Sequence, residues 1–210
     1  MKKIIMLIMA LCLSVNFVDA QNKALEKALK KEYKTTKKRL EKENWKLFAS
    51  SRSLDVVLLK HYDKLTSLGD NGKEVVGLAS RFKSKNVGLQ MAINSACTQY
   101  AQQAGSHVRG RATSDMRGDG VSAATEFDNF YAAYERLVEK EIRGEMEQSF
   151  AVIRANGDGT YEAEVYFVIN EDAASKARMR ALENAARESE AAQKWAQGVS
   201  DFVREGFENM

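Results

Sequence analysis

Proline is absent from this 210-residue sequence, and cysteine and histidine occur only twice each. Without proline the chain has no stiff extended linkers, which favours helices and strands joined by short turns. Cys12 lies in an apolar N-terminal run, so Cys97 has no partner for an intramolecular disulfide once that run is removed. His61, His107 and Cys97 match no metal-site or nucleophile signature, and we predict no catalytic residue, no metal ligand and no cofactor.

The first twenty residues have the features of a secretory signal peptide. Two lysines precede an apolar run over residues 4–15, and Val18-Asp19-Ala20 forms a cleavage site before Gln21. The run is too short to span a bilayer. The alternative is lipid attachment at Cys12, but this cysteine lies deep in the run and follows a bulky leucine. We therefore expect an exported chain that begins at Gln21 and resides in the periplasm or cell envelope, where it could associate with the outer membrane.

Charge is nearly balanced in the mature chain but is unevenly distributed along it. The sequence has 32 basic and 29 acidic residues, and removing the two lysines and one aspartate of residues 1–20 leaves 30 and 28. This balance gives no basis for nucleic-acid binding, and we predict no nucleic-acid partner. Residues 21–48 nevertheless hold ten basic side chains against four acidic ones. A charged partner of this segment would be anionic.

A basic amphipathic helix is predicted over residues 21–43. Its apolar positions form one narrow stripe at helical spacing, namely Leu25, Leu29, Tyr33, Thr36 and Leu40. In one interpretation this stripe lies on the domain and the lysines are only solvated. In the other, the helix is a surface arm that binds anionic lipid head groups or an acidic protein. The contact residues predicted for that arm are Lys30, Lys34, Lys37 and Lys38.

The strongest structural signal is a β-hairpin over Ser149–Asn170. Two runs rich in aromatic and β-branched residues flank an Asn-Gly-Asp-Gly turn. In the second run apolar residues alternate with Glu162 and Glu164. This alternation predicts a half-buried strand with both glutamates in solvent.

The position of the turn sets which side chains of the hairpin share a face. A two-residue turn within residues 156–159 places Phe150 and Val152 on the face of Val165 and Phe167, and a shift of one residue would turn them to solvent. The apolar face needs a cover, and the helices around the hairpin are the candidates.

Periodicity and turn residues predict the elements between the basic helix and the hairpin. In chain order they are a short strand over 44–50, a helix over 53–68, a strand over 73–82, an Ala-rich helix over 87–104, a strand over 106–113, an irregular loop over 114–125 and a helix over 125–143. The last of these helices has a broad aromatic face, which we assign as one cover for the hairpin.

One long helix is predicted after the hairpin, from residue 171 to about residue 205, with a length on the order of 50 Å. Trp195, Val199 and Phe202 recur along its second half at four-three spacing. A helix of this length exceeds a small domain, so it either folds back or ends against another chain. We predict Trp195, Val199 and Phe202 as contacts for a protein partner or for a second copy of the chain.

The alternative to a binding protein is an exported polysaccharide hydrolase. Glu162 and Glu164 are the best-placed carboxylate pair, because two residues on one face of a strand lie roughly 7 Å apart at the backbone. That separation is near the one used by inverting glycosidases. The same alternation is equally typical of solvated residues on a half-exposed strand.

Three motifs follow one another between about residues 74 and 170: VVGLASRF before the Ala-rich helix, HVRGRAT after it, and NGDGTYEAEVYFVIN at the end. Together they resemble the small Gram-negative envelope lipoprotein family that includes flagellar outer-membrane accessory proteins. The resemblance implies an α+β domain that assembles or binds in the envelope and has no catalytic residues. The chain differs from that family in lacking a lipid-attachment cysteine at the cleavage site.

The predicted organisation is a signal peptide (1–20), a basic amphipathic helix (21–43), an α+β domain (44–170) and a long C-terminal helix (171–210). Within this α+β fold, an antiparallel sheet is expected around the 149–170 hairpin, with helices packed on one face. The expected function is that of a non-enzymatic, exported interaction or assembly protein of the cell envelope. Its expected partners are a protein, a second copy of the chain, or an anionic membrane surface.

Overall fold

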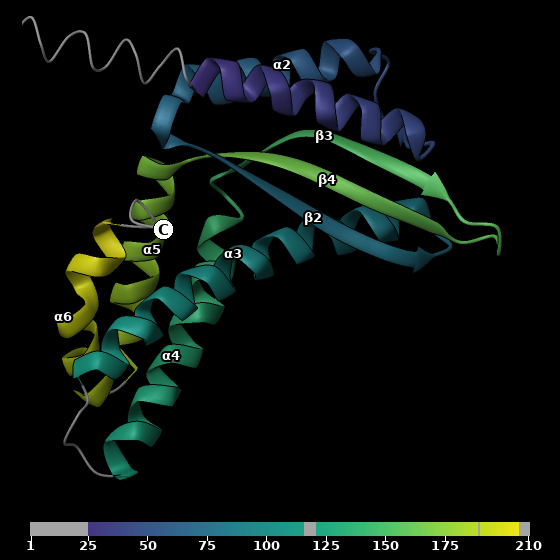
Figure 1. The fold of residues 1–210 in the computed structure, drawn as a ribbon. Helices are drawn as coiled ribbons and strands as arrows, with labels where there is room; N and C mark the ends of the chain where they lie inside the picture. Colours follow the sequence, from purple (N-terminus) through teal and green to yellow (C-terminus); the bar gives the residue numbers. More distant parts are fainter. Residues whose placement is uncertain (1–24, 116–120, 189, 206–210) are drawn as a thin grey trace, which may run out of the picture.

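The chain has the predicted α+β fold, in which a four-stranded sheet adjoins a group of helices (Figure 1). The computed structural model describes residues 25–115, 121–188 and 190–205. The predicted signal peptide lies outside the described residues. Within them, the first element is a helix over residues 25–42, which we call the N-terminal helix.

The sheet is antiparallel throughout, with the strand order β1-β3-β4-β2. Its strands are β1 (Lys46–Leu47), β2 (Gly72–Phe82), β3 (Met146–Ala155) and β4 (Tyr161–Asn170). The predicted hairpin is therefore confirmed, and it forms the two central strands. Of the three strands predicted earlier in the chain, those over 44–50 and 73–82 are confirmed as the outer ones, although β1 is shorter than expected.

The register of the hairpin differs from the predicted one by a single residue. Ala155 pairs with Tyr161, so the loop between the strands, residues 156–160, contains an odd number of residues. The predicted two-residue turns require an even number. Gly159 has the positive φ of 79° that the loop requires. Phe150 and Val152 therefore point to the face that was predicted to be solvent-exposed, yet both are buried there.

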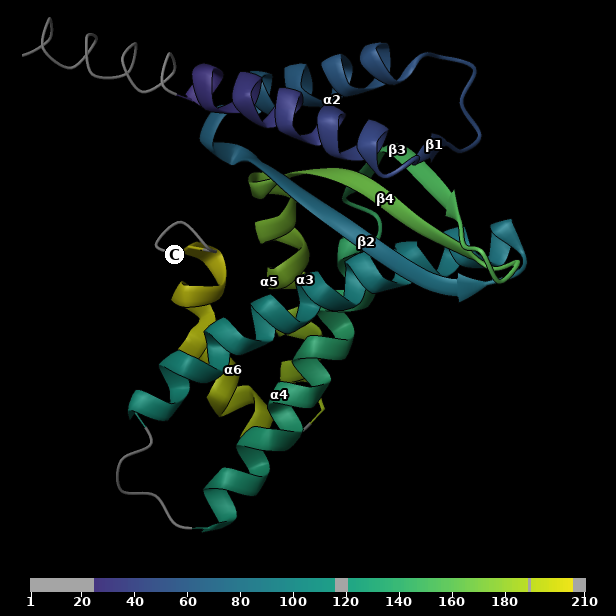
Figure 2. The ribbon, with the colours of Figure 1, turned by 45° about the vertical axis from the view of Figure 1, so that its right-hand side comes forward.

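Helices cover both faces of the sheet, which corrects the prediction that they pack on one face. The N-terminal helix and α2 (Leu54–Leu68) lie over one face, and α3 (Lys85–Asp115) runs along the other (Figures 1 and 2). As a result, seven consecutive residues of β4, residues 163–169, are buried. The alternating glutamates of this strand did not mark a solvent-exposed face, because the side chain of Arg39 meets one of them across the helix–sheet interface.

α3 is one continuous helix where the sequence predicts a helix followed by a strand. The predicted strand over 106–113 lies inside it. Ala101, Ala104 and Val108 are buried at helical spacing. Helical periodicity therefore continues into the segment that was predicted to be a strand. The first half of α3 packs on the sheet, and its second half belongs to the helical core.

The helical half of the molecule combines the end of α3 with α4 (Val121–Ile142), α5 (Glu171–Ala186) and α6 (Glu190–Glu205). Of the predicted loop over 114–125, residues 116–120 lie outside the described residues, and the rest belongs to α3 and α4. The aromatic face of α4 packs against the other helices of this half. It is not the cover for the hairpin that the sequence suggested.

The predicted long C-terminal helix is two helices. α6 runs back along α5, and this reversal is visible in Figure 2. Alanines line the interface, where Ala177, Ala181 and Ala185 of α5 share a buried core with Ala192 and Ala196 of α6. Their small side chains let the two helices approach closely. The chain therefore folds back, which is one of the two outcomes that the sequence left open.

Candidate functional site

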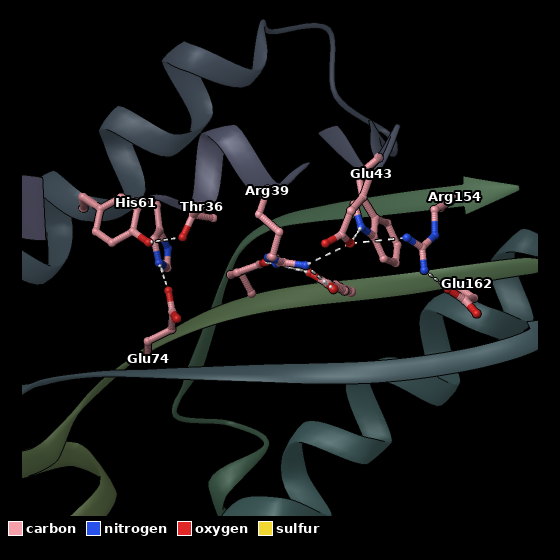
Figure 3. A network of polar contacts seen from close by, with 11 residues as sticks. Thr36, Arg39, Glu43, His61, Glu74, Arg154 and Glu162 are labelled. Carbon is pink, nitrogen blue, oxygen red and sulfur yellow. Dashed lines mark hydrogen bonds and ion pairs between the residues drawn. The ribbon is translucent and has the colours of Figure 1, made fainter. Parts of the chain in front are cut away.

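The N-terminal helix is joined to the sheet by a bidentate ion pair between Arg39 and Glu164 (Figure 3). Arg39 Nη1 donates to Glu164 Oε1 at 2.9 Å, and Nη2 donates to Oε2 at 2.7 Å. The hydroxyl of Tyr166 donates to the same Oε2 at 2.6 Å. The hydrogen bonds that Arg39 donates to Glu164 raise the pKa of its guanidinium, and burial raises the pKa of the Tyr166 hydroxyl. Both oxygens of this carboxylate are thus engaged within the protein.

The polar network continues toward the end of the N-terminal helix. Glu43 Oε2 accepts a hydrogen bond from Trp45 Nε1 at 3.0 Å and one from Arg154 Nη1 at 3.3 Å. Arg154 Nη2 donates to Glu162 Oε2 at 2.5 Å, and its guanidinium lies 4.6 Å from the centre of the Trp45 ring. Figure 3 shows Glu43, Arg154 and Glu162 together beside the strands, at the end of the N-terminal helix. The network therefore ties that helix to both central strands.

A cavity of about 340 Å³ lies beside this network. Its lining includes Glu43, Glu162, Glu164, Arg154, Trp45 and Leu78. The structure thus brings Glu162 and Glu164, the carboxylate pair of the hydrolase alternative, to one cavity, but each is paired with an arginine. Glu164 is 8 % exposed, so the prediction that both glutamates lie in solvent is wrong. A carboxylate whose two oxygens already accept internal hydrogen bonds is poorly placed to protonate a substrate or activate water.

His61 of α2 is a packed core residue on the side of that helix that faces the sheet. Its Nε2 lies 2.5 Å from Glu74 Oε2, and its ring makes edge-on contacts with Tyr62, Phe150 and Tyr166. The side chain is fully buried. Within residues 25–115, 121–188 and 190–205, no group of three or more His, Cys, Asp or Glu side chains could hold a metal ion.

Replacing Arg39 with methionine is expected to lower the free energy of unfolding by about 2 kcal/mol. The substitution leaves the Glu164 carboxylate without its guanidinium, although water that reaches the partly exposed Arg39 position compensates in part. Urea unfolding followed by circular dichroism measures the change. Lys38→Met is the control, because it changes the same charge at the next, exposed position and should shift stability by no more than about 0.5 kcal/mol. Equal losses in the two variants would show that the ion pair contributes nothing.

Five lysines form a continuous stripe on the outer face of the N-terminal helix: Lys27, Lys31, Lys34, Lys38 and Lys42. Their spacing of four, three, four and four residues places them on one side of the helix over about 22 Å. All five side chains are exposed, and none forms an ion pair with another residue that the structure describes. We call this surface the lysine stripe.

Of the four lysines predicted as contacts, two belong to the lysine stripe and two do not. Lys34 and Lys38 are members. Lys30 is exposed beside the stripe, where its Nζ lies 2.6 Å from Glu26 Oε1. Lys37 faces α2 instead, with its Nζ 2.5 Å from Asp55 Oδ1, and this contact lowers the pKa of the Asp55 carboxyl.

The residues predicted as contacts at the C-terminal end lie within or along the helical core. Val199 is buried there at 3 % exposure. Trp195 is partly buried, and its ring meets that of Phe127 edge-on with centres 5.1 Å apart. Phe202 belongs to α6, but its side chain lies outside the described residues. Packing on the chain's own helices accounts for the first two side chains without a second copy.

Cys97 is expected to be unreactive in the folded protein. The side chain is 1 % exposed in the helical core, and burial raises the pKa of its thiol. At pH 8 the native protein should react with 5,5′-dithiobis(2-nitrobenzoate) at least about a hundredfold more slowly than the protein unfolded in guanidinium, because the thiol must be exposed first. Comparable rates in the two states would contradict the buried position.

Sequence reasoning missed the Arg39–Glu164 pair and incompletely recognised the lysine stripe. The ion pair joins residues 125 positions apart, so no local pattern connects them. The lysine stripe, in contrast, can be read from its spacing alone, once lysines rather than apolar residues are placed on the helix.

Comparison with models of protein families, with curated proteins and with solved structures found no match. In the part of the chain that the structure describes, no helix combines the length and the apolar character needed to cross a membrane.

Proposed function

We propose that this protein is a non-enzymatic, exported protein of the cell envelope that works by binding an anionic partner through the lysine stripe. The proposal rests above all on one observation: five exposed lysines occupy one side of a helix without internal ion pairs to described residues. Charges of one sign at this density attract an oppositely charged surface. This attraction becomes weaker as salt is added, because salt screens the charges.

The stripe is presented on a rigid support. The opposite side of the N-terminal helix is held by the buried Leu40 and by the Arg39–Glu164 pair, so the lysines face outward. A helix that is already ordered loses little conformational entropy when it binds.

The hydrolase alternative is less well supported. Glu164 forms an ion pair with Arg39, and Glu162 forms one with Arg154. These ion pairs give both glutamates a structural role that does not require catalysis. Assays of the wild-type chain on envelope polysaccharides test the alternative directly. If cleavage were found and Glu162→Gln abolished it, the proposal of a non-enzymatic protein would fail.

The proposed function is tested by neutralising the lysine stripe. In the variant with Lys27, Lys31, Lys34 and Lys38 changed to glutamine, association with the envelope fraction of the expressing cells should fall by at least about tenfold, because most of the attractive charge is lost. Co-sedimentation of the predicted mature chain, from Gln21, with washed envelopes gives the measurement.

A matched control changes the same number of exposed lysines elsewhere. It carries glutamine at four exposed positions: Lys83, Lys140, Lys176 and Lys194. Glutamine is a good helix former, so both variants should keep the fold, which circular dichroism checks. The control should bind envelopes like the wild type. The proposal is contradicted if the stripe variant also binds like the wild type, or if the two variants lose binding equally.

A further inference from the structure

Two large apolar side chains are exposed on the same helix layer as the lysine stripe. Val56 and Leu59 of α2 are 41 % and 56 % exposed. They lie one helical turn apart, on the side of α2 that faces away from its buried residues, such as Leu58 and Leu65. Together they form a small exposed apolar patch, and contiguous exposed apolar surface is a feature of contact sites.

The N-terminal helix and α2 form one continuous outer surface. The hydroxyl of Tyr33 donates to Asp55 Oδ1 at 2.9 Å, which holds the helices side by side. A shallow groove of about 190 Å³ between them is lined by Leu29, Lys30 and Leu59 among others. Figures 1 and 2 show the two helices together as the layer on the side of the sheet opposite α3. Leu59 therefore opens onto the same groove as the edge of the basic helix.

We propose that this outer surface docks on an anionic phospholipid bilayer. The lysine stripe lies against the head groups, while Leu59 and Val56 enter the boundary between head groups and acyl chains. The inference rests on the proposed function and names its partner. Basic side chains beside aliphatic ones on an amphipathic helix surface are the pattern that binds at the membrane interface. Each lysine near an anionic leaflet adds to the attraction, and shallow apolar insertion supplements it.

The composition of the surface favours lipid over a specific polyanion. Every cation in the stripe is lysine, a compact charge that does not impose the bidentate geometry through which arginine recognises individual phosphates or carboxylates. A diffuse layer of head groups needs no such geometry. An acidic protein would satisfy the lysines but would leave the aliphatic pair unexplained.

Docking in this way fixes the orientation of the molecule. Because the helix layer lies on one face of the sheet and α3 on the other, the sheet would separate the bilayer from α3 (Figure 1). The helical half, with α4, α5 and α6, would then extend away from the membrane and remain accessible.

The first experiment measures binding of the predicted mature chain to phosphatidylcholine vesicles with and without phosphatidylglycerol. Binding should require phosphatidylglycerol and weaken by at least about tenfold between low salt and about 0.5 M salt, where charges are strongly screened. The four-lysine stripe variant should bind at least about tenfold more weakly, whereas the matched variant at residues 83, 140, 176 and 194 should bind like the wild type.

The second experiment tests insertion of the aliphatic pair. The double variant Val56→Gln and Leu59→Gln should bind these vesicles about tenfold more weakly, because the apolar contribution is removed. The control, Val87→Gln and Met91→Gln, changes two comparably exposed apolar residues of α3 and should have no effect. An environment-sensitive dye attached at Leu59→Cys should shift to the blue on vesicles, while the dye at Val87→Cys should not. The native Cys97 is buried and should not compete for the label.

The outcomes separate this inference from the proposed function. If the stripe variant loses envelope association but the wild type does not bind phosphatidylglycerol vesicles, the lipid partner is wrong and an acidic envelope protein takes its place. Vesicle binding that is unchanged by the Val56 and Leu59 substitutions, with no spectral shift, would overturn insertion. If the wild type binds neither envelopes nor vesicles, both proposals fail together.

Discussion

Replacing Arg178 with methionine is expected to lower the free energy of unfolding by about 3–5 kcal/mol, one of the two largest effects expected for this protein. Arg178 is 2 % exposed in the helical core. Its guanidinium donates to Glu171 Oε1 at 2.6 Å, to the Val203 carbonyl oxygen at 3.2 Å and to the Tyr100 hydroxyl. One side chain thus links α3, α5 and α6. Without it, the carboxylate of Glu171 is buried without a countercharge.

Arg180 provides a control on the same helix. It also pairs with two glutamates, but its side chain is 45 % exposed. Arg180→Met should therefore cost no more than about 1 kcal/mol, as is usual for surface ion pairs. Urea unfolding of the two variants makes the comparison. Equal losses would show that burial does not determine the strength of the Arg178 contacts.

The origin of the loss can be tested by removing the charge that Arg178 leaves behind. If the unpaired Glu171 carboxylate is the main cost, Glu171→Gln should be markedly less damaging in the Arg178→Met background than in the wild type. The double variant should then recover part of the stability, because both buried charges are gone. Strictly additive effects would instead attribute the loss to packing.

Gly77→Ala is expected to destabilise the protein by about 3 kcal/mol, at the upper end of the usual range for overpacking. Gly77 lies in β2 where α3 crosses the sheet. A Cβ atom at this position would lie 1.9 Å from the backbone carbonyl oxygen of Ala92 and 2.9 Å from the Cβ of Ala96. The first of these atoms belongs to the main chain of α3, so no side-chain rotation relieves the contact. The helix would have to move away from the sheet.

Gly110→Ala in α3 tests whether the Gly77 effect comes from space rather than from the loss of glycine. A Cβ atom at Gly110 meets nothing within 4 Å. Alanine also reduces the conformational entropy of the unfolded chain, so this variant should gain about 0.4–1 kcal/mol. Thermal unfolding of both variants gives the measurement. A Gly77→Ala protein as stable as the wild type would mean that β2 and α3 lie farther apart than the structure places them.

The sequence predicted the parts of the fold that depend on local periodicity. Alternation and turn residues identified β3 and β4 as a hairpin, and helical periodicity identified α2. This helix is capped locally by Ser53, whose side chain accepts a hydrogen bond from the Val56 N–H. The Ala-rich helix after β2 was also recognised. Its small residues allow the close approach of α3 to β2 at Gly77. Its full length was not predicted, because the second half of α3 packs against helices that come later in the chain.

The candidate site was only partly predictable from the sequence, because some of its contacts join segments that lie far apart in the chain. The excess of lysine over residues 21–48 is a property of the sequence, and it pointed to the helix that carries the lysine stripe. Which lysines face outward depends on how that helix sits on α2, since the Asp55 contact turns Lys37 inward. The pairing of Glu164 with Arg39 depends on a helix reaching a strand from far along the chain.

By itself, then, the sequence determined the α+β class, the central hairpin, most of the helices and the basic character of the N-terminal helix, because each follows from residues close together in the chain. The tertiary structure decided the one-residue register, the cover on both sheet faces, the burial of Glu164 and the reversal between α5 and α6. These features depend on which distant segments meet. A glutamate between apolar neighbours looks the same in the sequence whether it meets water or an arginine on a helix packed above it.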